Sequence, residues 1–205
     1  MKSAIRLKLV NQSEDAADNK IVVFQKDIGD VKSPRPVAWK VFNKLSSGDQ
    51  HSFLFPSDFQ VRAKNGWGQP ISKSVNVSKG QCYSVSKDSY GSEIKRGGTS
   101  THHKTIEIKN ELSKETILAE LYKDGKLLAK KTHISPQKVA NFRFRTSIWI
   151  GIVRHVSEGE IIPVDVLDAI QNEIHLKGIL SADIIITGNE IRGYHFDLDN
   201  ILFQD

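Results

Sequence analysis

The stretch FRFRTSIWIGIV, from Phe142 to Val153, decides the fold. Its apolar and polar residues alternate, which predicts a strand, a two-residue break and a second strand. The stretch FLFPSDFQVRA, from Phe53 to Ala63, has the same pattern. At a constant separation of 89 residues, Phe53, Phe55 and Phe59 are matched by Phe142, Phe144 and Ile148. We therefore interpret the chain as two divergent copies of one unit of about a hundred residues.

Short strand patterns with turn signals between them continue through most of the sequence. They predict an all-β fold, a tandem or fused β-sandwich of the immunoglobulin-like type. The segment 91–100 contains Gly97-Gly98 and is the best candidate for the join between the copies. The expected division is an N-terminal unit at 1–98 and a C-terminal unit at 99–205. The copies could form two lobes or exchange strands into one larger sandwich, and both arrangements stay open.

Two local patterns add detail to this fold. Asp124-Gly125 separates the apolar runs 117–122 and 127–131, which predicts a β-hairpin with a type I′ turn. In PVDVLDAIQNEIHL, from Pro163 to Leu176, apolar residues recur at spacings of four. This spacing predicts one short helix near 164–175, with an apolar stripe that caps an open end of the second pair of sheets.

Composition narrows the class of protein. The 205 residues are 39% hydrophobic and 26% charged, as in an ordinary folded domain, and the single cysteine excludes an internal disulfide. The charged residues near the N-terminus interrupt any signal-like apolar run, so we expect a cytoplasmic protein or one released without a signal peptide. Residues 1–100 hold 16 basic and 9 acidic residues, and residues 101–205 hold 13 and 15. The basic half could therefore meet an anionic partner, such as the acidic half of another copy.

No motif with catalytic chemistry is found. The histidines lie in different elements, and adjacent His102 and His103 would point to opposite faces of a strand. Asp197-x-Asp199-Asn200 lacks the glycine and the glutamate of a calcium loop, and nothing near Cys82 would activate its thiol. The sequence therefore predicts no catalytic residue, no metal site and no cofactor.

Trp67 is the most exposed-looking aromatic residue, because it lies between two glycines in a loop. Such an indole could stack on a sugar, enter a membrane interface or anchor a protein contact, or it could fold back over the end of the sandwich. The neighbouring basic residues would favour an anionic surface. The predicted ligand-binding set is Trp67, Arg62, Lys64 and Lys73. A nucleic-acid partner is not expected, because it would need a denser basic face with interleaved aromatics.

Four short motifs resemble those of a group of uncharacterised bacterial proteins, over most of the chain. They are VVFQK at 22–26, AWKV at 38–41, WIG at 149–151 and GILSADI at 178–184. Some members of that group are labelled aromatic ring-opening dioxygenases. The resemblance therefore implies a metal-dependent ring-cleaving activity, although it brings no catalytic residues with it.

The leading hypothesis from the sequence is a non-enzymatic β-sandwich protein that binds a partner or assembles with itself. Two units of opposite charge could dock head-to-tail, and a contact that does not close on itself produces rings or filaments. The alternatives are a lectin-like or cytolysin-like, membrane-active module that uses Trp67, and a metal-dependent dioxygenase.

Overall fold

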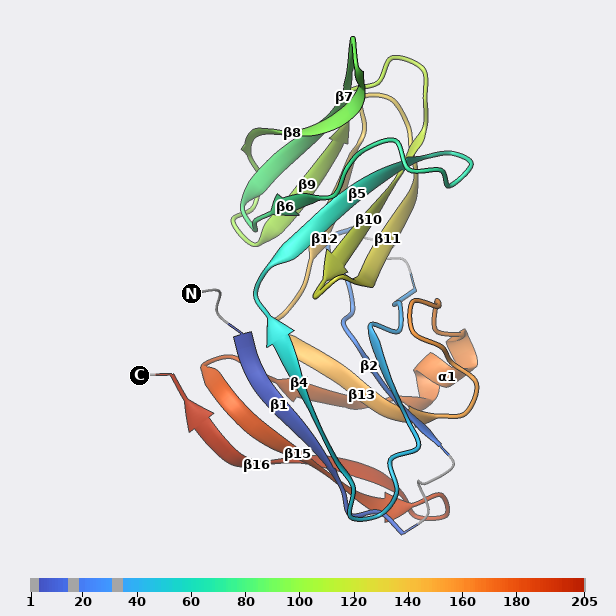
Figure 1. Cartoon of the computed structure of the whole chain (residues 1–205), viewed down its shortest axis with the longest axis vertical. Helices are drawn as coiled ribbons and strands as arrows, with labels where there is room; N and C mark the ends of the chain where they lie inside the picture. Colours follow the sequence, from blue (N-terminus) through green and yellow to red (C-terminus); the bar gives the residue numbers. More distant parts are fainter. Residues whose placement is uncertain (1–3, 15–18, 31–34, 205) are drawn as a thin grey trace. The chain divides into compact units, whose positions relative to one another are not determined.

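The computed structural model describes residues 4–14, 19–30 and 35–204. The predicted all-β fold is confirmed: the described residues form four sheets of four strands and one short helix. They are distributed over two compact units, each containing two of the sheets in a sandwich-like arrangement (Figure 1).

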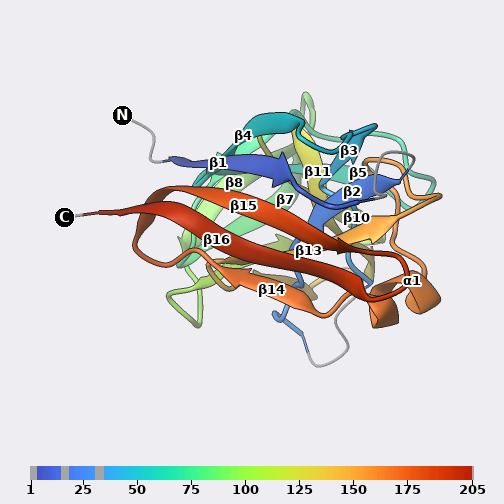
Figure 2. The ribbon, with the colours of Figure 1, turned by 90° about the horizontal axis from the view of Figure 1, so that it is seen from below.

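Unit 1 contains the described residues of 1–26, 35–57 and 146–205. Its first sheet has the order β16-β15-β1-β4, with bounds Gly193–Phe203, Ile179–Asn189, Ala4–Asn11 and Gln50–Pro56. Its second sheet has the order β14-β13-β2-β3, with bounds Asn172–His175, Ser147–Val153, Lys20–Phe24 and Lys40–Asn43. The parallel pairing of β1 with β15, which sets Leu7 opposite Ala182, joins the two ends of the chain in one sheet (Figure 2).

Unit 2 contains the described residues of 27–34 and 58–145. Its first sheet has the order β12-β9-β7-β8, with bounds Val139–Arg143, Thr105–Asn110, Gln81–Asp88 and Gly91–Thr99. Its second sheet has the order β11-β10-β5-β6, with bounds Lys126–Ile134, Ile117–Lys123, Phe59–Asn65 and Val75–Val77. The predicted hairpin is β10–β11, and positive φ angles at Asp124 (55°) and Gly125 (70°) fit its predicted turn.

The units do not follow the expected division into 1–98 and 99–205. Position 98 lies inside β8, and β7 and β8 belong to one sheet with β9 and β12. The boundaries between the units along the chain fall at 26/27, 34/35, 57/58 and 145/146, and the last two lie within the two stretches that begin with Phe-x-Phe. Strands are therefore exchanged between the two halves of the sequence, but they build two units rather than one larger sandwich.

The two units share one strand order. Each strand of unit 1 corresponds to the strand of unit 2 whose number differs by eight. The sheet β14-β13-β2-β3 therefore corresponds to β6-β5-β10-β11, and the sheet β16-β15-β1-β4 corresponds to β8-β7-β9-β12. Asn11 and Asn110 occupy matching places at the ends of β1 and β9. Their amides donate to the carbonyl oxygens of Leu45 (2.7 Å) and Ile134 (2.8 Å). The predicted sequence repeat itself stays a prediction.

The predicted helix is only partly right. The helix α1 covers Val164–Ala169, and the residues after it form β14, in which Ile174 pairs with Ile148 of β13. The extended backbone at Ile170 (φ −94°, ψ 107°) ends the helix, and β-branched Ile174 favours a strand. Ile170 is buried in the core of unit 1, with Val166 and Leu167 packed against the same cluster.

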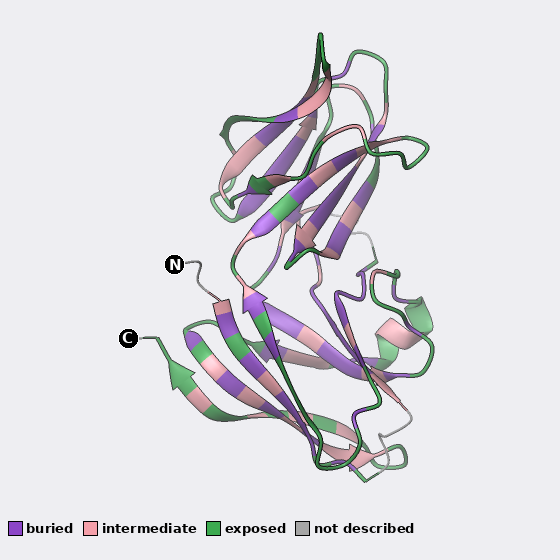
Figure 3. Cartoon of the chain, in the orientation of Figure 1, coloured by how far each residue is buried: buried purple, intermediate pink, exposed green. Residues whose placement is uncertain are grey.

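Each unit has its own aromatic core. In unit 1 the ring of Trp39 is fully buried and meets the rings of Phe53 and Phe55 edge-on, at centroid distances of 6.4 and 5.7 Å. In unit 2 the rings of Phe59 and Phe144 stack at 6.0 Å. Buried residues alternate with less buried ones along strands such as β5, β12 and β15 (Figure 3), as expected for sheets with one face in a core.

The segment 27–30 is attached to β12 in unit 2. The Ile28 N–H donates to the Arg143 carbonyl oxygen (2.8 Å), and the Arg143 N–H donates to the Asp27 carboxylate (2.9 Å). The Lys131 ammonium lies 3.1 Å from that carboxylate. Burial raises the pKa of Asp27, and Lys131 opposes this effect.

Candidate functional sites

Trp67 lies at the tip of the turn that follows β5, and its side chain is 92% exposed. The Asn65 side-chain oxygen accepts the backbone N–H groups of Trp67 (3.1 Å) and Gln69 (2.9 Å), which fixes this turn. The indole therefore does not fold back over the sandwich. It borders a cavity of about 530 Å³ whose lining residues are Asn65, Gly66, Trp67, Glu115 and Thr116.

The three basic residues predicted to accompany Trp67 do not line this cavity. The Arg62 guanidinium lies 5.6 Å from the centre of the Tyr122 ring, and the Lys64 ammonium lies 2.8 Å from the Glu120 carboxylate. Lys73 is exposed in the loop between β5 and β6. The cavity beside Trp67 instead contains the acidic Glu115, which the sequence analysis missed because it comes from a different loop.

Glu120 is a buried carboxylate on β10. Besides Lys64, it binds the Tyr122 hydroxyl, which donates a hydrogen bond to it. Burial, together with this hydrogen bond and the negative charge of Glu120, raises the pKa of Tyr122 to about 12. These contacts satisfy the groups within the sheet, so Arg62 and Lys64 act as packing partners here.

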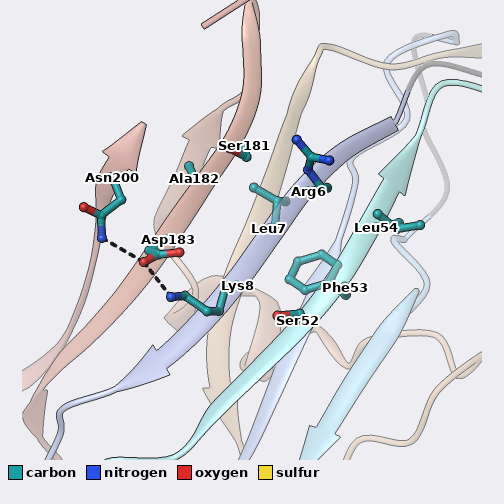
Figure 4. Close-up of a pocket in the computed structure, with 10 residues that line it drawn as sticks. All are labelled: Arg6, Leu7, Lys8, Ser52, Phe53, Leu54, Ser181, Ala182, Asp183 and Asn200. Carbon is teal, nitrogen blue, oxygen red and sulfur yellow. Dashed lines mark hydrogen bonds and ion pairs between the residues drawn. The ribbon is translucent and has the colours of Figure 1, made fainter. Parts of the chain in front are cut away.

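A groove of about 290 Å³ lies on unit 1, over β1, β4 and β15 (Figure 4). Because side chains alternate along a strand, Arg6, Lys8 and Leu54 point to the face opposite the buried Leu7 and Phe53. The residues that line the groove are Arg6, Leu7, Lys8, Ser52, Phe53, Leu54, Ser181, Ala182, Asp183 and Asn200. They come from β1, β4 and the β15–β16 hairpin, three segments that are far apart in sequence.

The polar wall of this groove is built around Asp183. The Lys8 ammonium and the Asn200 amide both bind its Oδ2 atom, each at 2.9 Å. These two hydrogen bonds and the charge of Lys8 outweigh burial and lower the pKa of Asp183, so it is charged at neutral pH. Irregularities in the pairing of β15 with β16 flank Ser181, and such irregularities can redirect side chains beside a site.

The strands β16 and β8 occupy corresponding edges of the two units. β16 has eleven residues, and none of them is buried (Figure 3). Its exposed Asp197 and Asp199 contrast with Lys95 and Arg96 of β8, which are also exposed. Lys95 pairs with Glu93, and Arg96 donates to the side chain of Gln81 (2.6 Å). Within the described residues, neither β16 nor β8 has a strand on its second side.

Two lysines of unit 2 approach one aromatic ring. The ammonium groups of Lys123 and Lys79 lie 4.5 and 5.7 Å from the centre of the Phe59 ring. Burial and the charge of Lys79 lower the pKa of Lys123 to about 7, against a smaller opposing effect of Asp58. Burial and the charge of Lys104 lower the pKa of Lys79. The folded protein therefore favours loss of a proton in this cluster.

A ring-cleaving dioxygenase would need three converging metal ligands. The described part of the chain contains no group of three His, Cys, Asp or Glu residues that could hold a metal ion. The described His, Cys, Asp and Glu side chains therefore do not fit such a site, and we derive no reaction step through a metal. Cys82 is half-buried, and burial raises the pKa of its thiol.

No helix in the described segments has the length and apolarity needed to cross a membrane. No family model, no curated protein and no solved structure matches this chain. The resemblance to a group of uncharacterised bacterial proteins therefore stays a prediction, and function has to be argued from the residues themselves.

Proposed function

We propose that this is a non-enzymatic binding protein that associates with further copies of itself, through contact of unit 1 of one copy with unit 2 of another. The observation that carries the proposal is the distribution of charge between the units. The sequence ranges of unit 2 hold 18 basic and 10 acidic residues, a balance of +8. Those of unit 1 hold 11 and 14, a balance of −3. The charges differ more between the units than between the two halves of the sequence.

The edges β16 and β8 are where we place this contact. A strand at the edge of a sheet presents unpaired backbone N–H and C=O groups, and these can pair with a strand of another chain. Acidic side chains on β16 and basic ones on β8 would favour pairing between the two kinds of edge. Pairing of either edge with its own kind would bring like charges together.

Such a contact joins two different surfaces of the protein, so it is heterologous. Each copy would keep a free β16 edge at one end and a free β8 edge at the other. Repetition produces a ring if the rotation between copies closes, and a filament if it does not. Because the attraction is between exposed charges, salt should weaken it.

Light scattering of nuclease-treated protein at low and high salt tests the proposal. We expect a mass above one chain that rises with protein concentration at low salt, and a lower mass at about 1 M salt, where the screening length is roughly 3 Å. Nuclease treatment removes the other source of salt-sensitive association, bridging by nucleic acid. A single-chain mass at every concentration and salt level would reject self-association.

Glycan or anionic membrane binding by the Trp67 turn is a second candidate. It is supported by the exposed indole and by the adjoining cavity, in which Asn65 and Glu115 could bind hydroxyl groups. We expect Trp67→Ala to weaken binding by 1 kcal/mol or more, about fivefold to tenfold, if a sugar stacks on this ring. Glycan-array and liposome binding of both proteins measure this. Binding that is absent, or equal for the two proteins, removes the candidate.

A further inference from the structure

We propose that the groove on unit 1 binds a small amphipathic carboxylate, with Arg6 holding the carboxylate and Leu54 contacting the apolar chain. This proposal does not depend on self-association, although Asn200 in the wall of the groove belongs to β16. The proposal rests on three features of the groove: an unpaired cation, a neutralised acid and an exposed apolar side chain.

Arg6 is the unpaired cation. Among the described residues, its side chain has neither an ion pair nor a hydrogen bond, whereas Lys8, two residues further along β1, binds Asp183. Figure 4 shows the Arg6 guanidinium turned away from the Lys8–Asp183 pair. A guanidinium presents several N–H donors in a plane and binds a carboxylate through two parallel hydrogen bonds. Its donors are therefore free for a ligand.

Among the described residues that line the groove, the one carboxylate, Asp183, is already neutralised. Lys8 and Asn200 both bind Asp183, so this acid does not compete for Arg6 or strongly repel an anionic ligand. Within the described part of the chain, the charged side chains that line the groove are Arg6, Lys8 and Asp183, with a balance of +1. A ligand with a single negative charge complements this balance.

Leu54 supplies the apolar contact. Its side chain is 49% exposed, on the same face of the sheet as Arg6. Leu7, Phe53 and Ala182 also border the groove, but their buried side chains point to the opposite face of the sheet, so Leu54 is the apolar side chain that a ligand would meet. A volume of about 290 Å³ lies at the lower end of the range for ligand pockets, roughly 300–1,000 Å³. The groove therefore fits a single short chain with one charged end.

Octanoate is a suitable probe, because it has one carboxylate and one apolar chain. Octylamine keeps the chain without the carboxylate, and sulfate is an anion without the chain, so the two compounds test these parts separately. By calorimetry we expect octanoate to bind with a stoichiometry of one, octylamine to bind at least about tenfold more weakly, and sulfate not to displace octanoate. Amide chemical-shift changes in the full-length protein should cluster on β1, β4 and β15. Equal binding of octylamine, displacement by sulfate, shifts elsewhere or no saturable binding would each overturn the proposal.

Three variants test the roles of the two residues. Arg6→Met should weaken octanoate binding about tenfold or more, and Arg6→Lys should weaken it less, because one cation remains. Leu54→Ser should weaken it severalfold, since it removes buried apolar area. Arg192→Met, which removes another exposed arginine of unit 1, is the matched control and should bind as the wild type does. These exposed sites should leave the melting temperature unchanged, and unaltered affinity in folded Arg6→Met contradicts the site.

Discussion

Replacing Lys123 by Met is expected to stabilise the protein at pH 7 and to flatten the rise of its stability at alkaline pH. Lys123 is 3% exposed, and its folded pKa of about 7 lies below the ordinary value of 10.5. Between these two pH values the unfolded chain binds a proton that the folded chain does not, so stability rises with pH. Below pH 7 both states carry the charge, and the folded state bears the full cost of burying it.

The expected size of the change in stability follows from the same shift in the pKa of Lys123. One pKa unit corresponds to about 1.4 kcal/mol, so the cost of the buried charge is a few kcal/mol and at most about 5 kcal/mol. Methionine has a similar length and no charge, and replacement of a buried charge by an apolar side chain is often stabilising. Urea unfolding at intervals from pH 6 to pH 9.5 measures the effect below the range in which Tyr122 titrates.

The control for this prediction is Lys138→Met, which removes an exposed lysine of unit 2. Its curve of unfolding free energy against pH should run parallel to that of the wild type. If the Lys123→Met curve also runs parallel to the wild type, Lys123 is charged in the folded protein throughout this range and the buried-lysine interpretation is incorrect.

The second large effect is expected for Trp39→Ala, which should lower the free energy of unfolding by about 3–5 kcal/mol. Trp39 is completely buried in unit 1 and contacts Phe53 and Phe55. Removal of the indole eliminates these contacts and leaves a cavity that the surrounding strands can close only in part. Urea unfolding followed by far-UV circular dichroism measures the loss without relying on tryptophan fluorescence.

Trp67→Ala provides a matched comparison, because it removes the same side chain from a site that is 92% exposed. Its effect should stay within about 0.5 kcal/mol of the wild type. Similar losses in the two variants would contradict the assignment of Trp39 to the core and Trp67 to a free loop.

The local elements of the fold were predictable from the sequence because their signals lie close together. The stretch at Phe142–Val153 forms the end of β12 and the whole of β13, and Asp124-Gly125 forms the expected turn. The helix was overestimated, because spacings of four in PVDVLDAIQNEIHL fit a helix while Ile174 pairs in a sheet instead. The largely apolar stretch VAWKVF at 37–42 predicts a strand there, but in the structure β3 begins only at Lys40.

Strand partners were not predictable, because they depend on contacts between distant segments. The parallel pairs β1–β15 and β7–β9 bring together segments from different halves of the sequence. The segments 79–88 and 177–188 both begin with Lys-Gly and resemble each other in sequence, and alignment of Gly80 with Gly178 would match Val85 with Asp183. In the structure Val85 lies opposite Asn110, and it is Ile186 that lies opposite Asn11. Shared motifs therefore indicated similar strands but did not set their register.

The candidate sites were harder to find than the strands. The groove combines residues near positions 6, 53, 182 and 200, and no local spacing in the sequence connects them. The predicted Trp67 set shared a stretch of sequence, but strand alternation and the partners Glu120 and Tyr122 direct its basic members elsewhere. The separation of charge between the units was only partly visible from the sequence. Each half of the sequence contributes residues to both units, so counts over the halves mix the two charge balances.

The central claim, association of β16 with β8 of another copy, is tested most directly by exchanging the charges of the two edges. One variant carries Asp197→Lys and Asp199→Lys, and the other carries Lys95→Glu and Arg96→Glu. Exposed residues of the same units serve as controls with equal changes in charge: Glu158→Lys with Asp165→Lys, and Lys73→Glu with Lys114→Glu. Each edge variant alone presents two edges of like charge, whereas a mixture of the two presents opposite charges at every contact.

The measurement is sedimentation velocity at low salt of each edge variant and of their equimolar mixture. The proposal predicts single chains for either edge variant alone, association restored in the mixture, and wild-type association for both control variants. Association of an edge variant by itself, or a mixture that remains as single chains, would contradict it.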